Sequence, residues 1–199
     1  MQAVASERPK DQAVAGVAGG SILVLGDSLS AEYGLPRGSG WVALLRARLA
    51  TQAPRYSVVN ASISGETTSG GLGRIKGLLN RDRPALVLIE LGGNDALRGL
   101  DLRSTESNLR QMVRLSRDAG AKVILLGMQV PPNSGQRYAD WFAGMYPRIA
   151  GSEGATLLPF FLAGFADRAD YFLPDRIHPT VAAQPLMLEN VWSVLRPLL

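Results

Sequence analysis

Short apolar runs alternate with amphipathic segments from Ser21 to the end of the chain. Five runs are bounded by glycine, proline or charged residues, which is typical of buried strands. They lie at residues 21–25, 56–60, 85–91, 122–128 and 156–158. The run at 85–91 is almost entirely apolar and indicates a central strand that is covered on both faces.

Segments with apolar residues at helical spacing follow these runs. We expect helices at residues 41–50, 70–80, 106–119, 136–150 and 184–195. Gly120 supplies a stop signal for the third of them. A strand followed by a helix, repeated along the chain, predicts an α/β fold with a parallel sheet and helices on both faces. Ligands bind such sheets at the carboxyl ends of the strands.

Polar residues and glycines gather directly after the first three predicted strands, at 26–30, 62–66 and 92–95. A fourth polar group, at 174–179, precedes the last helix. Each group alone is weak, because such residues are common in turns and helix caps and a lone histidine is more often structural. Together they supply complementary parts of one catalytic site.

The hydroxyl of Ser28 is a candidate nucleophile, and such a hydroxyl needs a base within hydrogen-bond reach. His178 is the only histidine in the chain. Asp175, three residues earlier, can orient the imidazole and stabilise its charged form. The amides of Ser28 and Gly65 and the side-chain amide of Asn94 are candidate oxyanion donors. The sequence therefore predicts a triad of Ser28, Asp175 and His178.

Structural roles compete with the catalytic ones. Ser28 could cap a turn, and Asp175 could form an Asx turn before the last helix. For Asp27 we expect a role in ordering the nucleophile turn, and for Asp95 a role in capping the segment that follows it. Leu97 and Leu100 are candidate substrate-binding residues in an acyl groove, although apolar side chains serve equally well in a core.

Composition narrows the chemistry of the 199-residue chain, which has one histidine, no cysteine and a formal charge of +4. Zinc and soft-metal sites need several His or Cys ligands, so we expect no metal and no cofactor. Thiol nucleophiles and disulfides are excluded. The arginines are scattered, which argues against nucleic acid as a partner. No run reaches the roughly 18 to 20 apolar residues of a membrane span.

The first 20 residues are small or polar and lack the apolar region of a secretory signal. We expect residues 1–20 to form a flexible extension and residues 21–199 a single domain. Either the protein is cytoplasmic or a signal has been removed. We expect a monomer that acts on a small-molecule substrate.

The segment Gly26-Asp27-Ser28-Leu29-Ser30 resembles the signature of GDSL lipases, and Ser28, Gly65, Asn94 and His178 match the four positions for which SGNH hydrolases are named. Blocks at 41–45, 60–68 and 90–95 are similar to the bacterial arylesterase and multifunctional acyl-CoA thioesterase/lysophospholipase branch. The similarity extends from Ser21 to Leu199.

This resemblance implies a flavodoxin-like three-layer α/β/α fold with strand order 2-1-3-4-5. It also implies the triad and oxyanion donors named above, a shallow open site, and a loop at 96–100 that moves when an acyl chain binds. A periplasmic or secreted location after signal removal is implied as well. Arg176 departs from the pattern of this branch, which often has glycine at that position. The departure bears on the substrate specificity that the resemblance implies more than on catalysis.

We therefore expect a serine hydrolase of aryl or short-to-medium acyl esters, with thioesters and lysophospholipids as further substrates. A carbohydrate acetylesterase with the same triad stays open. A Mg²⁺-dependent phosphohydrolase using Asp27, Asp95 and Asp175 is another alternative, since oxygen ligands suit that ion. A non-catalytic carbohydrate-binding module is a third, and a complete triad argues against it.

Overall fold

The computed structural model describes residues 19–130 and 134–199. Five parallel strands form one sheet in the order β2-β1-β3-β4-β5, which confirms the predicted α/β fold and strand order. The strands are β1 (Ser21–Gly26), β2 (Ser57–Asn60), β3 (Leu86–Glu90), β4 (Lys122–Leu126) and β5 (Thr156–Leu158). Nearly all of the predicted 1–20 extension lies outside the described residues.

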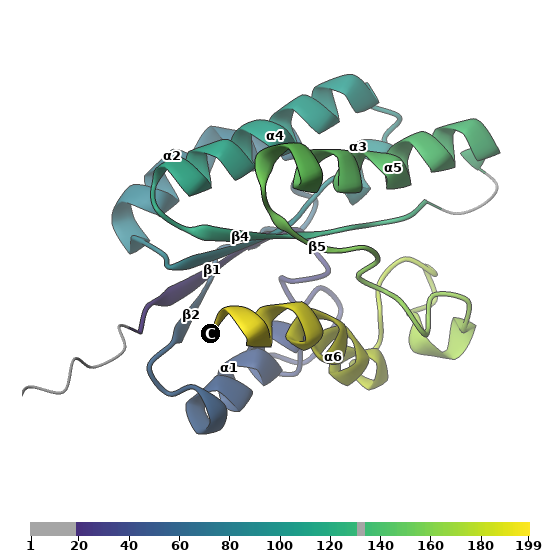
Figure 1. Ribbon diagram of the computed structural model, residues 1–199. Helices are drawn as coiled ribbons and strands as arrows, with labels where there is room; N and C mark the ends of the chain where they lie inside the picture. Colours follow the sequence, from purple (N-terminus) through teal and green to yellow (C-terminus); the bar gives the residue numbers. More distant parts are fainter. Residues whose placement is uncertain (1–18, 131–133) are drawn as a thin grey trace, which may run out of the picture.

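Helices cover both faces of the sheet, as Figure 1 shows. On one face α2, α4 and α5 lie side by side, and on the other α1 packs against α6. The bounds are α1 (Trp41–Gln52), α2 (Thr68–Asp82), α3 (Gly93–Leu97), α4 (Leu102–Asp118), α5 (Gln136–Glu153) and α6 (Gln184–Leu195). Because both faces are covered, the side chains of Ile22 to Leu25 and of Leu86 to Ile89 are almost completely buried.

Two helices begin earlier than the apolar pattern predicts, because polar caps extend them. Helix α4 begins at Leu102, where the Asp101 carboxylate accepts hydrogen bonds from the backbone N–H groups of Arg103 and Ser104. Helix α2 begins at Thr68 after the cap residue Thr67. The five-residue helix α3 was not predicted at all, since it is too short to show a period.

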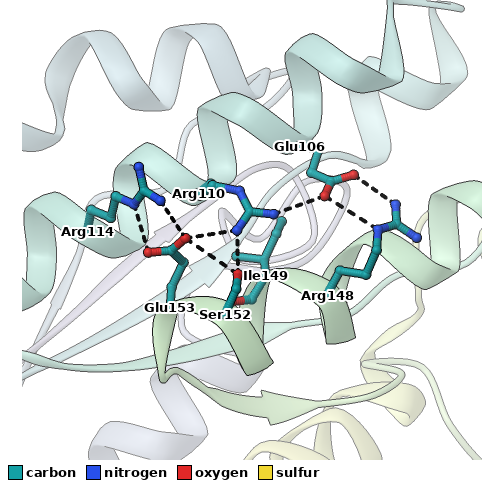
Figure 2. Close-up of polar contacts among 7 residues, drawn as sticks. All are labelled: Glu106, Arg110, Arg114, Arg148, Ile149, Ser152 and Glu153. Atoms are coloured by element: carbon teal, nitrogen blue, oxygen red, sulfur yellow. Dashed lines mark hydrogen bonds and ion pairs between the residues drawn. The ribbon is translucent and has the colours of Figure 1, made fainter.

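Ion pairs join α4 to α5 on the outer surface (Figure 2). Glu153 of α5 accepts hydrogen bonds from Arg110 and Arg114 of α4, and Glu106 of α4 pairs with Arg110 and with Arg148 of α5. We call these five residues the α4–α5 arginine cluster. Three of the scattered arginines, Arg110, Arg114 and Arg148, therefore form ion pairs with carboxylates of the protein's own surface.

Within residues 19–130 and 134–199, no helix combines the length and apolarity that crossing a bilayer would require.

Candidate active site

Three predicted catalytic side chains meet beyond the carboxyl end of β1. The Nε2 atom of His178 lies 2.9 Å from Ser28 Oγ, and its Nδ1 atom lies 2.7 Å from Asp175 Oδ2. Ser28 follows β1 in the turn after Gly26, whereas the other two residues come from the segment before α6. The distances allow His178 to take a proton from Ser28 while Asp175 holds the imidazole tautomer.

The backbone before α6 folds around the Asp175 carboxylate. Its Oδ1 atom accepts the N–H groups of Ile177 at 2.9 Å and His178 at 3.0 Å. Desolvation opposes ionisation, but these hydrogen bonds and the imidazole outweigh it and lower the pKa of Asp175 to about 2. Asp175 is therefore ionised at neutral pH. Its carboxylate both forms an Asx turn with the backbone and binds the imidazole of His178.

Two of the predicted oxyanion donors are backbone N–H groups. Among the described residues, the N–H groups of Ser28 and Gly65 have no protein acceptor. Gly65 has a φ of +78° in the turn between Ile63 and Glu66, a conformation that favours glycine. The Asn94 amide donates one hydrogen bond to Asp27 Oδ2 at 2.9 Å and keeps a second N–H, because a primary amide has two.

A buried acid lies beneath the turn that carries Ser28. Glu90, at the end of β3, is 1% exposed, and its Oε2 atom accepts hydrogen bonds from Ser30 Oγ at 2.8 Å and from the Asp27 N–H at 3.2 Å. The indole of Trp41 donates to Ser30 Oγ. A Cβ atom at Gly26 would lie 2.7 Å from Glu90 Oε2, so the missing side chain there makes room for this carboxyl group.

Two carboxyl groups share this buried region. Desolvation raises the pKa of Asp27 to about 6, although hydrogen bonds from Leu29 and Asn94 oppose the increase. Desolvation, and then repulsion by Asp27, raise the pKa of Glu90 well above its usual value. Asp27 orders the turn around Ser28 as expected, because its Oδ1 atom accepts the Leu29 N–H at 3.0 Å.

Asp95 differs from the prediction. Its carboxylate accepts the N–H of Thr68 at 2.9 Å and the Thr68 hydroxyl at 2.5 Å. It therefore holds the start of the preceding helix α2, with only a weaker 3.2 Å contact to Thr105 in the helix that follows. The tertiary structure decides which partner Asp95 binds, because α3 places this residue in the buried space between α2 and α4.

The end of α3 and the loop after it present the two candidate substrate-binding residues to solvent. The side chains of Leu97 and Leu100 are 55% and 42% exposed. Leu100 also lines a surface groove of about 510 Å³ between the first turns of α4 and α5. Arg176 has a left-handed φ of 58°, a conformation that favours glycine.

Sequence reasoning missed three residues around the site. Glu90 could have been found, because it is a charged residue in a run predicted to be buried on both faces. Tyr33, whose ring centroid lies 4.3 Å from that of His178, gave no local signal. Arg98 donates a hydrogen bond to the Gly65 carbonyl at 2.9 Å, and nothing in its neighbourhood along the chain indicated that partner.

The three aspartates of the phosphohydrolase alternative do not form one site. Asp95 is engaged by threonines, Asp175 by the imidazole, and Asp27 by Asn94 and the backbone. In the described part of the chain, no group of three or more His, Asp or Glu residues is arranged to hold a metal ion. This geometry does not favour the metal-dependent alternative.

Comparison with known proteins places the chain among esterases. It is 52% identical to esterase TesA of Pseudomonas aeruginosa over 90% of this chain and 89% of that protein. It is 40% identical to thioesterase 1/protease 1/lysophospholipase L1 of Escherichia coli K12, over 89% and 84% of the two chains. The crystal structure of the psychrotrophic esterase EstA from Pseudoalteromonas has a TM-score of 0.85 at 39% identity, covering 89% of this chain and 97% of that one.

A family model for GDSL-like lipases and acylhydrolases matches residues 24–185, which include every predicted catalytic and oxyanion residue. With this match over most of the chain, and with relatives far above 30% identity, the protein belongs to the GDSL-like lipase/acylhydrolase family.

Proposed function

We propose that this protein hydrolyses carboxylic esters through an acyl-enzyme formed on Ser28. The observation that carries the proposal is the continuous hydrogen-bonded series from Ser28 through His178 to Asp175, with contacts of 2.9 and 2.7 Å. Ester hydrolysis is further supported by relatives named as an esterase and as a thioesterase and lysophospholipase.

In the first half-reaction, Ser28 Oγ attacks the ester carbonyl carbon as His178 accepts the hydroxyl proton. The ionised Asp175 stabilises the imidazolium. The carbonyl oxygen becomes an oxyanion, for which the N–H groups of Ser28, Gly65 and Asn94 are the donors. His178 then gives its proton to the leaving alcohol, and the C–O bond breaks.

In the second half-reaction, water takes the place of the alcohol. His178 accepts a proton from the water, whose oxygen attacks the acyl carbon. The oxyanion collapses, the bond to Ser28 breaks, and His178 returns its proton to Ser28 as the carboxylic acid leaves. Because each attack needs neutral imidazole, activity falls when His178 becomes protonated.

The test compares Ser28→Ala and His178→Ala with the parent in hydrolysis of p-nitrophenyl butyrate. Each variant should lose at least about 10⁴-fold in kcat, since the nucleophile and its base act as one unit. Ser193→Ala is a matched control on the exposed face of α6 and should keep full activity. Parental turnover by Ser28→Ala would refute the proposal.

An organophosphonate provides an independent arm. The related Pseudoalteromonas esterase is inhibited by monoethylphosphonate. We expect a fluorophosphonate to add one group to Ser28, detectable as a mass increase that is absent from Ser28→Ala. As the chain has no cysteine, thiol labelling cannot mimic this result. Activity that EDTA abolishes, without labelling, would instead favour the Mg²⁺-dependent phosphohydrolase.

The same site suits thioesters and lysophospholipids, which together with simple esters are the first candidate class of substrate. Acetylated sugars are the second candidate class. Both candidates use the same triad, so a panel of acyl lengths and leaving groups compared by kcat/KM separates them. We further propose that the protein acts as a monomer in the periplasm or outside the cell, to which the absence of cysteine is suited. Cell fractionation and light scattering test these two points.

A further inference from the structure

The two oxyanion donors beyond Ser28 come from different parts of the chain. Gly65 lies in the loop between β2 and α2, residues 61–67, which we call the Gly65 loop. Asn94 lies in α3, after β3. Since an oxyanion hole works only when its donors are held at fixed positions, something must keep the Gly65 loop in place against α3.

Two contacts join these segments. Directly after the Gly65 loop, at the first residue of α2, the Asp95 carboxylate accepts hydrogen bonds from the backbone N–H and the hydroxyl of Thr68. Beside Gly65 itself, the Arg98 guanidinium donates from Nη2 to the Gly65 carbonyl at 2.9 Å. A Cβ atom at Gly65 would lie 3.4 Å from the same nitrogen, so the guanidinium rests directly on this residue.

Arg98 is also fixed to the second donor. Its backbone N–H donates to the carbonyl of Asn94 at 3.1 Å, four residues earlier. One helical turn therefore carries the Asn94 amide and a side chain that binds the peptide of Gly65. Glycine has more backbone freedom than any other residue, so an external contact matters most at such a position.

We propose that Arg98 is a positioning residue, whose guanidinium holds the Gly65 loop against α3 and so sets the separation of the Gly65 and Asn94 donors. This inference rests on the proposed function. Arg98 takes part in no ion pair among residues 19–130 and 134–199, so its described contact is this carbonyl.

The test measures kcat and KM of Arg98→Ala and Arg98→Lys with p-nitrophenyl butyrate, a neutral substrate. We expect kcat of Arg98→Ala to fall about 10-fold while KM stays within about twofold, because a displaced donor weakens transition-state binding more than substrate binding. Arg98→Lys should be intermediate, since an ammonium can still donate to the carbonyl but lacks the planar fork.

Three further measurements separate positioning from other roles. Inactivation by a fluorophosphonate should slow in proportion to kcat, because its phosphoryl oxygen needs the same donors. The acidic limb of the pH profile should not move, since His178 is untouched. Arg196→Ala removes the same charge from the segment after α6, where the Leu198 carbonyl accepts a hydrogen bond from Lys122 at the amino end of β4. This variant should behave like the parent. Melting temperatures of all variants report on folding.

An unchanged kcat for Arg98→Ala would overturn the inference. So would a rise in KM confined to an anionic ester, since that result makes Arg98 a substrate-binding residue. A fall in kcat that Arg98→Lys does not partly restore would also count against it. The Ser28→Ala control separates this inference from the proposed function: if that control is inactive and Arg98→Ala is not impaired, only the inference fails.

Discussion

The α4–α5 arginine cluster gives a stability prediction that can be worked out from the structure. Glu153 at the end of α5 accepts hydrogen bonds from Arg114 Nε at 2.7 Å, Arg114 Nη2 at 2.9 Å and Arg110 Nη1 at 2.8 Å (Figure 2). Only 9% of its side chain is exposed. Replacing Glu153 by glutamine keeps the shape but removes the charge that both guanidinium groups face.

The lowered pKa of Glu153 sets an upper bound on the loss of stability in Glu153→Gln. Hydrogen bonds from Arg114 and then Arg110 lower it from 4.5 to about 2, which corresponds to at most about 3 kcal/mol of stabilisation of the carboxylate. Solvent weakens the pair, because 59% of the Arg114 side chain is exposed. We therefore expect Glu153→Gln to lower the free energy of unfolding by about 2 kcal/mol, and the melting temperature by about 4–8 °C.

The dependence on pH follows from the direction of the pKa shift. A carboxylate whose pKa is lowered in the folded state stabilises the protein above its unfolded pKa, and this contribution is lost as the pH falls from about 4.5 to 2. The parent and Glu153→Gln should thus differ most above pH 5 and converge in acid. Urea unfolding followed by circular dichroism between pH 3 and 7 measures both curves.

Glu189→Gln is the matched control. Glu189 pairs with Arg48, but 58% of its side chain is exposed, so its loss should change stability by less than about 0.5 kcal/mol. Equal effects of the two substitutions would refute the argument that burial of the carboxylate matters. A difference between the parent and Glu153→Gln that persists unchanged at pH 3 would refute the electrostatic origin.

Two further predictions concern the site. Glu90→Gln keeps an acceptor for Ser30 and the Asp27 N–H but cannot ionise. Because burial raises the Glu90 pKa, the parent should lose stability relative to this variant as the pH rises above the ordinary glutamate value of 4.5. A pH-independent difference in urea unfolding would contradict this. Arg176→Gly relieves a left-handed φ of 58° and should stabilise the protein by about 1 kcal/mol, visible as a melting temperature about 2–4 °C higher. An unchanged or lower melting temperature would show that the turn is not strained.

The alternation of apolar and amphipathic segments was enough to predict the layers, because the local spacing of apolar residues indicates whether one or both faces of a strand or helix are buried. The bounds of α6 match the prediction at both ends. Where the bounds differ, as at the start of α4, a polar cap extends the helix beyond its apolar stripe. The helix α3 is held by contacts of Asp95 with distant threonines and has no pattern of its own.

The sequence by itself determined which side chains are candidates for the proposed chemistry, since one histidine and no cysteine leave little choice. It placed each candidate at the end of a predicted strand or before the last helix. Only the tertiary structure decided what supports them. Ser30 binds Glu90 across 60 residues, Gly65 binds Arg98 across 33, and Thr68 binds Asp95 across 27. Such contacts exist because parallel strands bring their carboxyl ends to one edge, and no local pattern records which of the polar groups gathered there will meet.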